Sequence, residues 1–69
     1  MTRDEQECTF LEGVTCDTET DLSIHIIDDE GREFWIPKSL ICEESDVWGQ
    51  GDQGDIYIPE WFALQEGMI

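Results

Sequence analysis

The fold is decided by residues 22–37, whose sequence is LSIHIIDDEGREFWIP. In its first half apolar and polar residues alternate, with the period of two that a half-buried strand shows. A turn sequence follows and ends at Gly31, which tolerates left-handed backbone. The alternation then resumes until a proline, which cannot donate to a strand ladder. We therefore predict a β-hairpin over residues 21–36, with Phe34 and Ile36 on its buried face.

Outward from the hairpin, the sequence indicates two further strands and one helix. Residues 56–58 form a third strand, and Pro59 suits the first position of a helix that ends at Gly67. A first strand is expected over residues 8–11, followed by a turn at Glu12-Gly13 and an extension over residues 14–16. Residues 36–37 and 58–59 are both Ile-Pro, so each strand is expected to break into a short helical turn.

These elements predict one mainly β (α+β) domain over residues 8–69, preceded by a flexible acidic tail at residues 1–7. Its architecture is expected to be a small antiparallel bent sheet, or an SH3-like or OB-like barrel of three to five strands, closed by a short C-terminal helix. The expected core is formed by Leu11, Val14, Leu22, Ile24, Ile26, Phe34, Ile36, Leu40, Ile41, Ile56, Ile58 and Phe62.

The most informative property for function is charge, because 18 acidic residues against three Lys and Arg give a formal net charge of −15 in 69 residues. Size scaling gives such a domain roughly one net negative charge per 300 Å² of surface. Duplex DNA carries about one per 100 Å². Carboxylates gathered on a third of the surface would approach that density, and a basic protein would then bind this face as it binds nucleic acid.

The number of cysteines and the lengths of the apolar runs indicate the cellular compartment. Cys8, Cys16 and Cys42 are an odd number, which favours reduced thiols over a secreted disulfide framework. No apolar run approaches the roughly 18 residues that span a bilayer, and the first residues contain no apolar signal segment. We expect a cytoplasmic protein that does not bind membranes.

Several kinds of site are disfavoured by the sequence. The three cysteines and His25 are residue types that bind zinc. They lack the Cys-x2-Cys spacing that is usual at structural zinc sites. A Cys-His nucleophile needs an electropositive setting, and this chain offers the opposite. Residues 28–30 and 52–55 do not follow a calcium-loop pattern. Three cations cannot neutralise a phosphate backbone, so direct nucleic-acid binding is not expected. We predict no enzyme and no cofactor.

Three tryptophans are more than so small a core readily hides. Trp35 and Trp61 can pack against each other or against the helix. Trp48 lies in residues 43–55, which we expect to form a mobile acidic loop with three glycines. An exposed Trp48 would be suited to anchoring a partner, because aromatic residues dominate interface hot spots.

A pattern in the second half of the chain carries a resemblance. It reads Asp29-x-Gly31-x-Glu33-x-Trp35-Ile36-Pro37-Lys38-Ser39-x-Ile41, then Ile58-Pro59-Glu60-Trp61-x-Ala63 and Gly67. This resembles small acidic proteins encoded by bacteriophages, with departures at Phe62 and Glu66. The resemblance implies an inhibitor of host defence, such as an anti-CRISPR or anti-restriction protein.

Charge and resemblance together favour a binding protein whose acidic face blocks the basic groove of a host nucleic-acid-handling protein. The predicted partner-binding residues are Asp28, Asp29, Glu30, Glu43, Glu44, Asp46, Trp48, Asp52 and Asp55. An alternative is an accessory or assembly module that binds a protein, or itself as a dimer, through the apolar segment 34–42. A third possibility, a pocket that stacks a nucleotide on Trp and Tyr, needs more cations than Arg32 and Lys38 supply.

Overall fold

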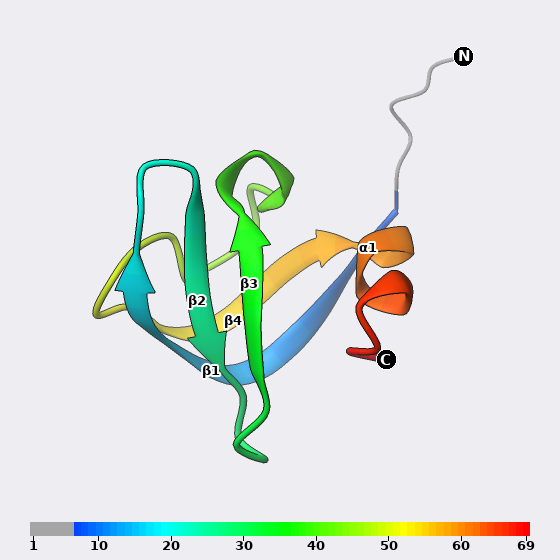
Figure 1. Ribbon diagram of the computed structural model, residues 1–69. Coiled ribbons are helices and arrows are strands. Elements are labelled where there is room, and N and C mark those ends of the chain that lie inside the picture. Colours follow the sequence, from blue (N-terminus) through cyan, green and yellow to red (C-terminus); the bar gives the residue numbers. More distant parts are fainter. Residues whose placement is uncertain (1–6) are drawn as a thin grey trace.

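The computed structural model describes residues 7–69 and shows one four-stranded antiparallel sheet with a short C-terminal helix (Figure 1). In spatial order the strands are β3 (Glu33–Pro37), β2 (Ser23–Ile27), β1 (Cys8–Glu19) and β4 (Gln53–Pro59). A 3-10 turn, η1 (Lys38–Leu40), follows β3, and helix α1 (Glu60–Gln65) follows β4. The mainly β, α+β prediction is confirmed, and of its two forms the open sheet is the one observed.

The predicted hairpin is present as β2 and β3. His25 stands opposite Trp35 at its centre, and Ile24 stands opposite Ile36. Gly31 adopts a φ of 86° in the turn, as the sequence required. Ile36 is fully buried as expected.

Strand β1 corrects the prediction for residues 8–16, because it runs unbroken through the expected turn at Glu12-Gly13. Its pairing with β4 shifts register between Leu11 and Val14, which marks a β-bulge, and Gly13 has a φ of 67° there. A bulge adds a residue to one strand and bends it without ending it. The first half of β1 therefore pairs with β4 alone, and its second half also pairs with β2.

The core lies inside this bent sheet and differs from the predicted set at one clear position. Leu22 is 78% exposed, because it lies in the turn between β1 and β2 rather than in the hairpin strand. Phe34 and Leu40 are partly buried against the core, and the other predicted members are buried. Four residues of the core cluster lie outside the expected core set: Cys16, Val47, Ala63 and Met68.

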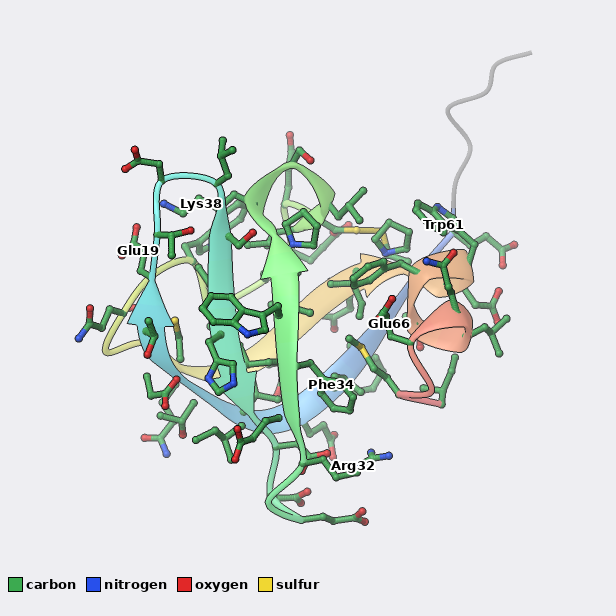
Figure 2. The ribbon with its side chains drawn as sticks, in the orientation of Figure 1. Glu19, Arg32, Phe34, Lys38, Trp61 and Glu66 are labelled. Carbon is green, nitrogen blue, oxygen red and sulfur yellow. A yellow bond between two sulfur atoms is a disulfide. The ribbon has the colours of Figure 1, made fainter. Side chains whose placement is uncertain are left out.

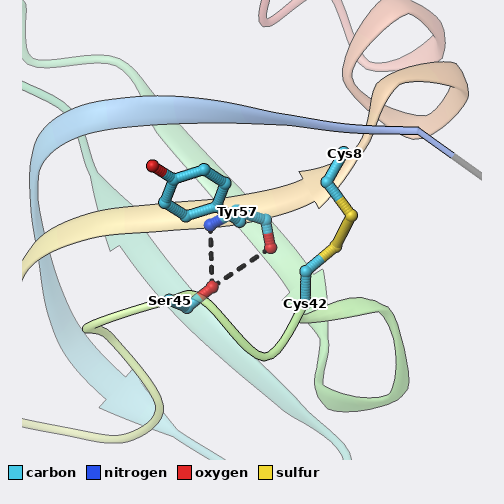
Figure 3. Close-up of a disulfide and its surroundings, with 4 residues drawn as sticks. All are labelled: Cys8, Cys42, Ser45 and Tyr57. Atoms are coloured by element: carbon cyan, nitrogen blue, oxygen red, sulfur yellow. Dashed lines mark hydrogen bonds between the residues drawn. A yellow bond between two sulfur atoms is a disulfide. The ribbon is translucent and has the colours of Figure 1, made fainter.

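The expected mobile loop at residues 43–55 is held against the sheet. The Cys42 N–H donates to the Tyr57 carbonyl at 2.8 Å, and the Asp46 N–H donates to the Asp55 carbonyl at 2.8 Å. The Ser45 hydroxyl bonds both the N–H and the carbonyl of Tyr57 (Figure 3). Residues 42–46, which we call the edge segment, thus cover the outer edge of β4.

A disulfide between Cys8 and Cys42 joins the start of β1 to the edge segment (Figure 3). The expectation of three reduced thiols is wrong for this pair, and only Cys16 is free and buried. Cys8 pairs with Pro59 at the end of β4, while Cys42 bonds Tyr57 from the opposite edge. The cysteines are 34 residues apart and meet through this pairing, which cysteine spacing does not reveal. The cysteines therefore give no indication of a reducing compartment.

Helix α1 begins directly after Pro59 and packs against β4 and β1. Gly67 has a φ of 76°, and the Met68 N–H returns to the Ala63 carbonyl at 2.8 Å. Both expected breaks at Ile-Pro are observed, since η1 follows Pro37 as α1 follows Pro59. Of the predicted tail, only Glu7 falls within the described residues, and its carbonyl accepts the Glu60 N–H.

A matched pair of substitutions tests the corrected core. Val47→Ala should lower the free energy of unfolding by about 2 kcal/mol, because two buried methyl groups are lost and a cavity remains. Leu22→Ala should change it by less than about 0.5 kcal/mol, because that side chain is already in solvent. Urea unfolding followed by tryptophan fluorescence measures both. Equal losses would contradict the burial of Val47 and the exposure of Leu22.

Candidate partner-binding surface

The two cationic side chains among the described residues, Arg32 and Lys38, form ion pairs with carboxylates. The two pairs lie at opposite ends of the sheet (Figure 2). Arg32 Nε lies 2.8 Å from Asp28 Oδ2, and Lys38 Nζ lies 2.7 Å from Glu19 Oε2. The chain exposes 4202 Å², so its net charge of −15 corresponds to one charge per roughly 280 Å². No lysine or arginine between residues 7 and 69 is left to offset the remaining carboxylates.

Asp28, a predicted partner-binding residue, is instead buried within the hairpin turn. Its Oδ1 accepts the N–H groups of Glu30 and Arg32, and its Oδ2 accepts Arg32 Nε. Burial raises the pKa of this carboxyl, but these hydrogen bonds and the guanidinium charge outweigh burial and hold it below its ordinary value. Asp28 therefore organises the hairpin turn.

Two other carboxylates organise the loop before β4. Asp52 Oδ2 accepts the N–H groups of Trp48 and Gly49 at 2.8 and 2.9 Å. Glu19 Oε1 accepts the Gln50 N–H at 3.0 Å. The hydrogen bond from Lys38, followed by that from Gln50, lowers the pKa of Glu19. The predicted residue Asp52 is half-buried. Its Oδ2 is already bonded to the backbone of its own loop.

Three acidic residues occupy neighbouring positions across β1, β4 and the edge segment. Glu12 and Gly13 form the bulge opposite Asp55 of β4. Asp55 in turn pairs with Asp46, whose N–H donates to the Asp55 carbonyl and whose Oδ2 lies 3.4 Å from the Asp55 N–H. We call Glu12, Asp46 and Asp55 the carboxylate row. Sequence reasoning identified Asp46 and Asp55 but missed Glu12, because the register that brings it there depends on the bulge.

An aromatic pair adjoins the carboxylate row on the outer face of the sheet. Phe10 stands opposite Tyr57, and their rings stack with centroids 5.3 Å apart. Their neighbours Leu11 and Ile56 are buried, so the pair points away from the core. The alternation of Ile56, Tyr57 and Ile58 was the available signal for Tyr57. For Phe10 no comparable signal was present.

The two predicted acidic groups, the hairpin turn and the loop, lie apart but are connected. Asp29 and Glu30 are exposed at the hairpin turn, while Glu43 and Glu44 are exposed within the edge segment. A hollow of about 300 Å³ bordered by Phe10, Glu12, Asp29, Glu30 and Arg32 joins the hairpin turn to the carboxylate row. Glu12 of the carboxylate row and the acidic residues of the hairpin turn therefore border the same hollow, together with the cation Arg32.

All three indole rings are close to half exposed. Trp35 is 52%, Trp48 44% and Trp61 49% exposed. Trp35 tilts over His25 with ring centroids 4.9 Å apart, and Trp61 meets Phe62 edge-on at 5.8 Å. The Trp48 indole N–H donates to the Ser45 carbonyl, which holds its ring beside the edge segment.

His25 lies between two carboxylates on the outer face of β2. Its Nδ1 is 2.6 Å from Asp17 Oδ1, and its Nε2 is 3.4 Å from Glu33 Oε1. The hydrogen bond to His25 lowers the pKa of Asp17. Burial raises the pKa of the remaining thiol, Cys16. In the described part of the chain, no three His, Cys, Asp or Glu side chains are grouped so that they could hold a metal ion.

Comparison of the chain with protein-family models, curated proteins and solved structures finds no match. None of the helices within residues 7–69 has the length and apolar character needed to cross a bilayer.

The lowered carboxyl pKa values predict acid sensitivity. Asp17, Glu19 and Asp28 have folded-state pKa values below their ordinary values near 4, so their stabilisation is present above that pH. It is lost as pH falls through the folded values. In 0.5 M NaCl, which screens general repulsion, the thermal midpoint should fall between about pH 4.5 and 2.5. Asp28→Asn should flatten this fall and Asp29→Asn should not; identical profiles would contradict the role of Asp28.

Proposed function

We propose that this protein is an acidic binding protein that occupies the basic groove of a nucleic-acid-handling protein and thereby inhibits it. A host defence protein is the class of target that the bacteriophage resemblance suggests. The mechanism is competition, because a surface rich in uncompensated carboxylates takes the place of the phosphates that the groove normally binds.

The observation that carries the proposal is the pairing of both described cations with Asp28 and Glu19. Arg32 also lies 3.6 Å from Glu30, whereas within residues 7–69 Glu12, Asp29, Asp46 and Asp55 form no ion pair with Arg32 or Lys38. A basic groove supplies the missing countercharge. Stacked Phe10 and Tyr57 add an aromatic surface next to the carboxylate row, as bases lie next to phosphates.

The alternative, an assembly module using residues 34–42, is supported by half-exposed Trp35 and partly buried Phe34 and Leu40. Salt distinguishes the two functions, because screening weakens charge pairing whereas apolar contacts persist.

The test immobilises the protein and exposes it to nucleic-acid-binding proteins from a bacterial lysate at 50 mM NaCl, followed by elution at 500 mM. The proposal expects a basic nucleic-acid-handling protein to bind and to be released by salt. Retention of the bound protein at 500 mM, or recovery of this chain alone as a self-associated species, would favour the assembly module.

A further inference from the structure

The two outer edges of the sheet differ in whether backbone covers them. The edge segment covers the outer edge of β4 through main-chain hydrogen bonds at Tyr57 and Asp55. β3 is the other terminal strand, and among the strands of residues 7–69 it pairs with β2 alone. Among residues 7–69, no backbone segment bonds to the outer edge of β3. Helix α1 packs on β4 and β1 and does not close this edge.

The hydrogen-bond phase of the hairpin identifies the groups on the open edge. The Asp28 N–H donates to Arg32, and the Lys38 N–H donates to Leu22. Antiparallel pairs alternate between bonded and non-bonded, so Phe34 and Ile36 bond to β2 while the intervening residues do not. The N–H and carbonyl groups of Glu33 and Trp35 therefore point outward.

We infer that the open edge of β3 accepts an extended strand from the basic protein bound under the proposed function, on which this inference rests. Adding a strand to a free edge supplies main-chain hydrogen bonds, and side chains then set specificity. On the outer face, the strand would meet the Glu33 carboxylate, 65% exposed, and the half-exposed Trp35 ring. On the inner face, it would extend over partly buried Phe34 and Leu40.

These two faces define the sequence of the added strand. Basic residues are favoured on its outer face, where Glu33 offers a carboxylate and Trp35 offers a ring for a cation. Apolar residues are favoured on its inner face. The strand should therefore alternate basic and apolar side chains. A second copy of this chain is disfavoured, because each carries a net charge of −15 and would bring a second Glu33 to the edge.

Amide hydrogen exchange tests the inference directly, with a hexapeptide alternating lysine and valine as the probe. In the free protein, the Trp35 and Glu33 amides should exchange within the dead time, while the Ile36 amide, bonded to β2, is protected. With saturating peptide, exchange of the Trp35 amide should slow at least about tenfold. A peptide of the same composition with its lysines and valines in blocks should leave it unchanged.

A backbone substitution provides the second test. Trp35→Pro removes the outward-pointing N–H of residue 35 and breaks no hydrogen bond to β2. An edge strand tolerates proline at such a position. It should weaken binding of the alternating peptide about tenfold more than Trp35→Ala, which keeps the N–H. Protection of the Ile36 amide reports that the hairpin remains formed. Peptide binding without Trp35 protection, or equal affinities of the two variants, would overturn the inference. Capture of basic proteins that is unaffected by Trp35→Pro would leave the proposed function standing.

Discussion

Replacement of Cys8 and Cys42 by serine is expected to lower the free energy of unfolding by about 4 kcal/mol. The estimate follows from the entropy that the unfolded chain regains when a loop closed over a sequence separation of 34 is opened. A domain of this size has a total stability of only about 3 to 10 kcal/mol, so the variant should be close to unfolded at 37 °C. Thermal unfolding followed by circular dichroism, with and without reducing agent, measures the effect.

The matched control is Cys16→Ala, which removes the free thiol and keeps the bond. Reducing agent should destabilise the wild type and Cys16→Ala alike, and it should leave the double serine variant unchanged. An unfolding midpoint of the wild type that does not respond to reducing agent would show that the bond contributes no stability.

Neutralising the carboxylate row is expected to weaken binding to the basic partner on the order of 100-fold at low salt. The variant combines Glu12→Gln, Asp46→Asn and Asp55→Asn, which occupy neighbouring positions across β1, β4 and the edge segment. An asparagine at position 46 retains the oxygen that faces the Asp55 N–H, so the edge should stay formed. Titration calorimetry with the captured partner at 50 mM NaCl provides the affinity.

A control variant that removes three negative charges elsewhere on the surface separates the effect of position from the effect of net charge. Asp21→Asn, Glu60→Gln and Glu66→Gln are exposed substitutions away from the carboxylate row. This control should weaken binding less than about tenfold, through the general field alone. Equal losses in the two triple variants would mean that only total charge matters and that the row has no special role.

The parts of the fold that could be predicted from sequence are those governed by local patterns. Alternation and Gly31 defined the hairpin, and Pro59 with Gly67 defined the helix, because each signal acts within a few residues. Strand β1 was mistaken for two pieces because Gly13 serves a turn and a bulge equally well. Only pairing with β4, more than 40 residues further along the chain, selects the bulge.

The candidate surface shows the same division. Carboxylates at Asp46 and Asp55 were predicted from composition, and both lie in the carboxylate row. Composition could not distinguish them from Asp28 and Asp52, whose oxygens accept main-chain N–H groups in their own turns. Asp46 Oδ2 also accepts a main-chain N–H, that of Asp55, so which carboxylates bond the backbone depends on turn and strand geometry that composition does not specify. The same limit hid the meeting of Cys8 and Cys42 across the end of β4.

The disulfide and the candidate surface are physically connected. The bond fixes Cys42 at the start of the edge segment, whose later residue Asp46 belongs to the carboxylate row. Ser45 adds two hydrogen bonds to Tyr57, the aromatic neighbour of that row. The geometry of the acidic surface therefore depends on the covalent attachment of the edge segment.

Competition for one groove is the most direct test of the account. The captured partner is saturated with a fluorescently labelled DNA duplex at 50 mM NaCl and titrated with this protein while anisotropy is followed. We expect full displacement of the duplex, with an apparent inhibition constant that rises steeply between 50 and 300 mM NaCl. Formation of a ternary complex, in which the duplex stays bound and anisotropy increases, would contradict charge mimicry.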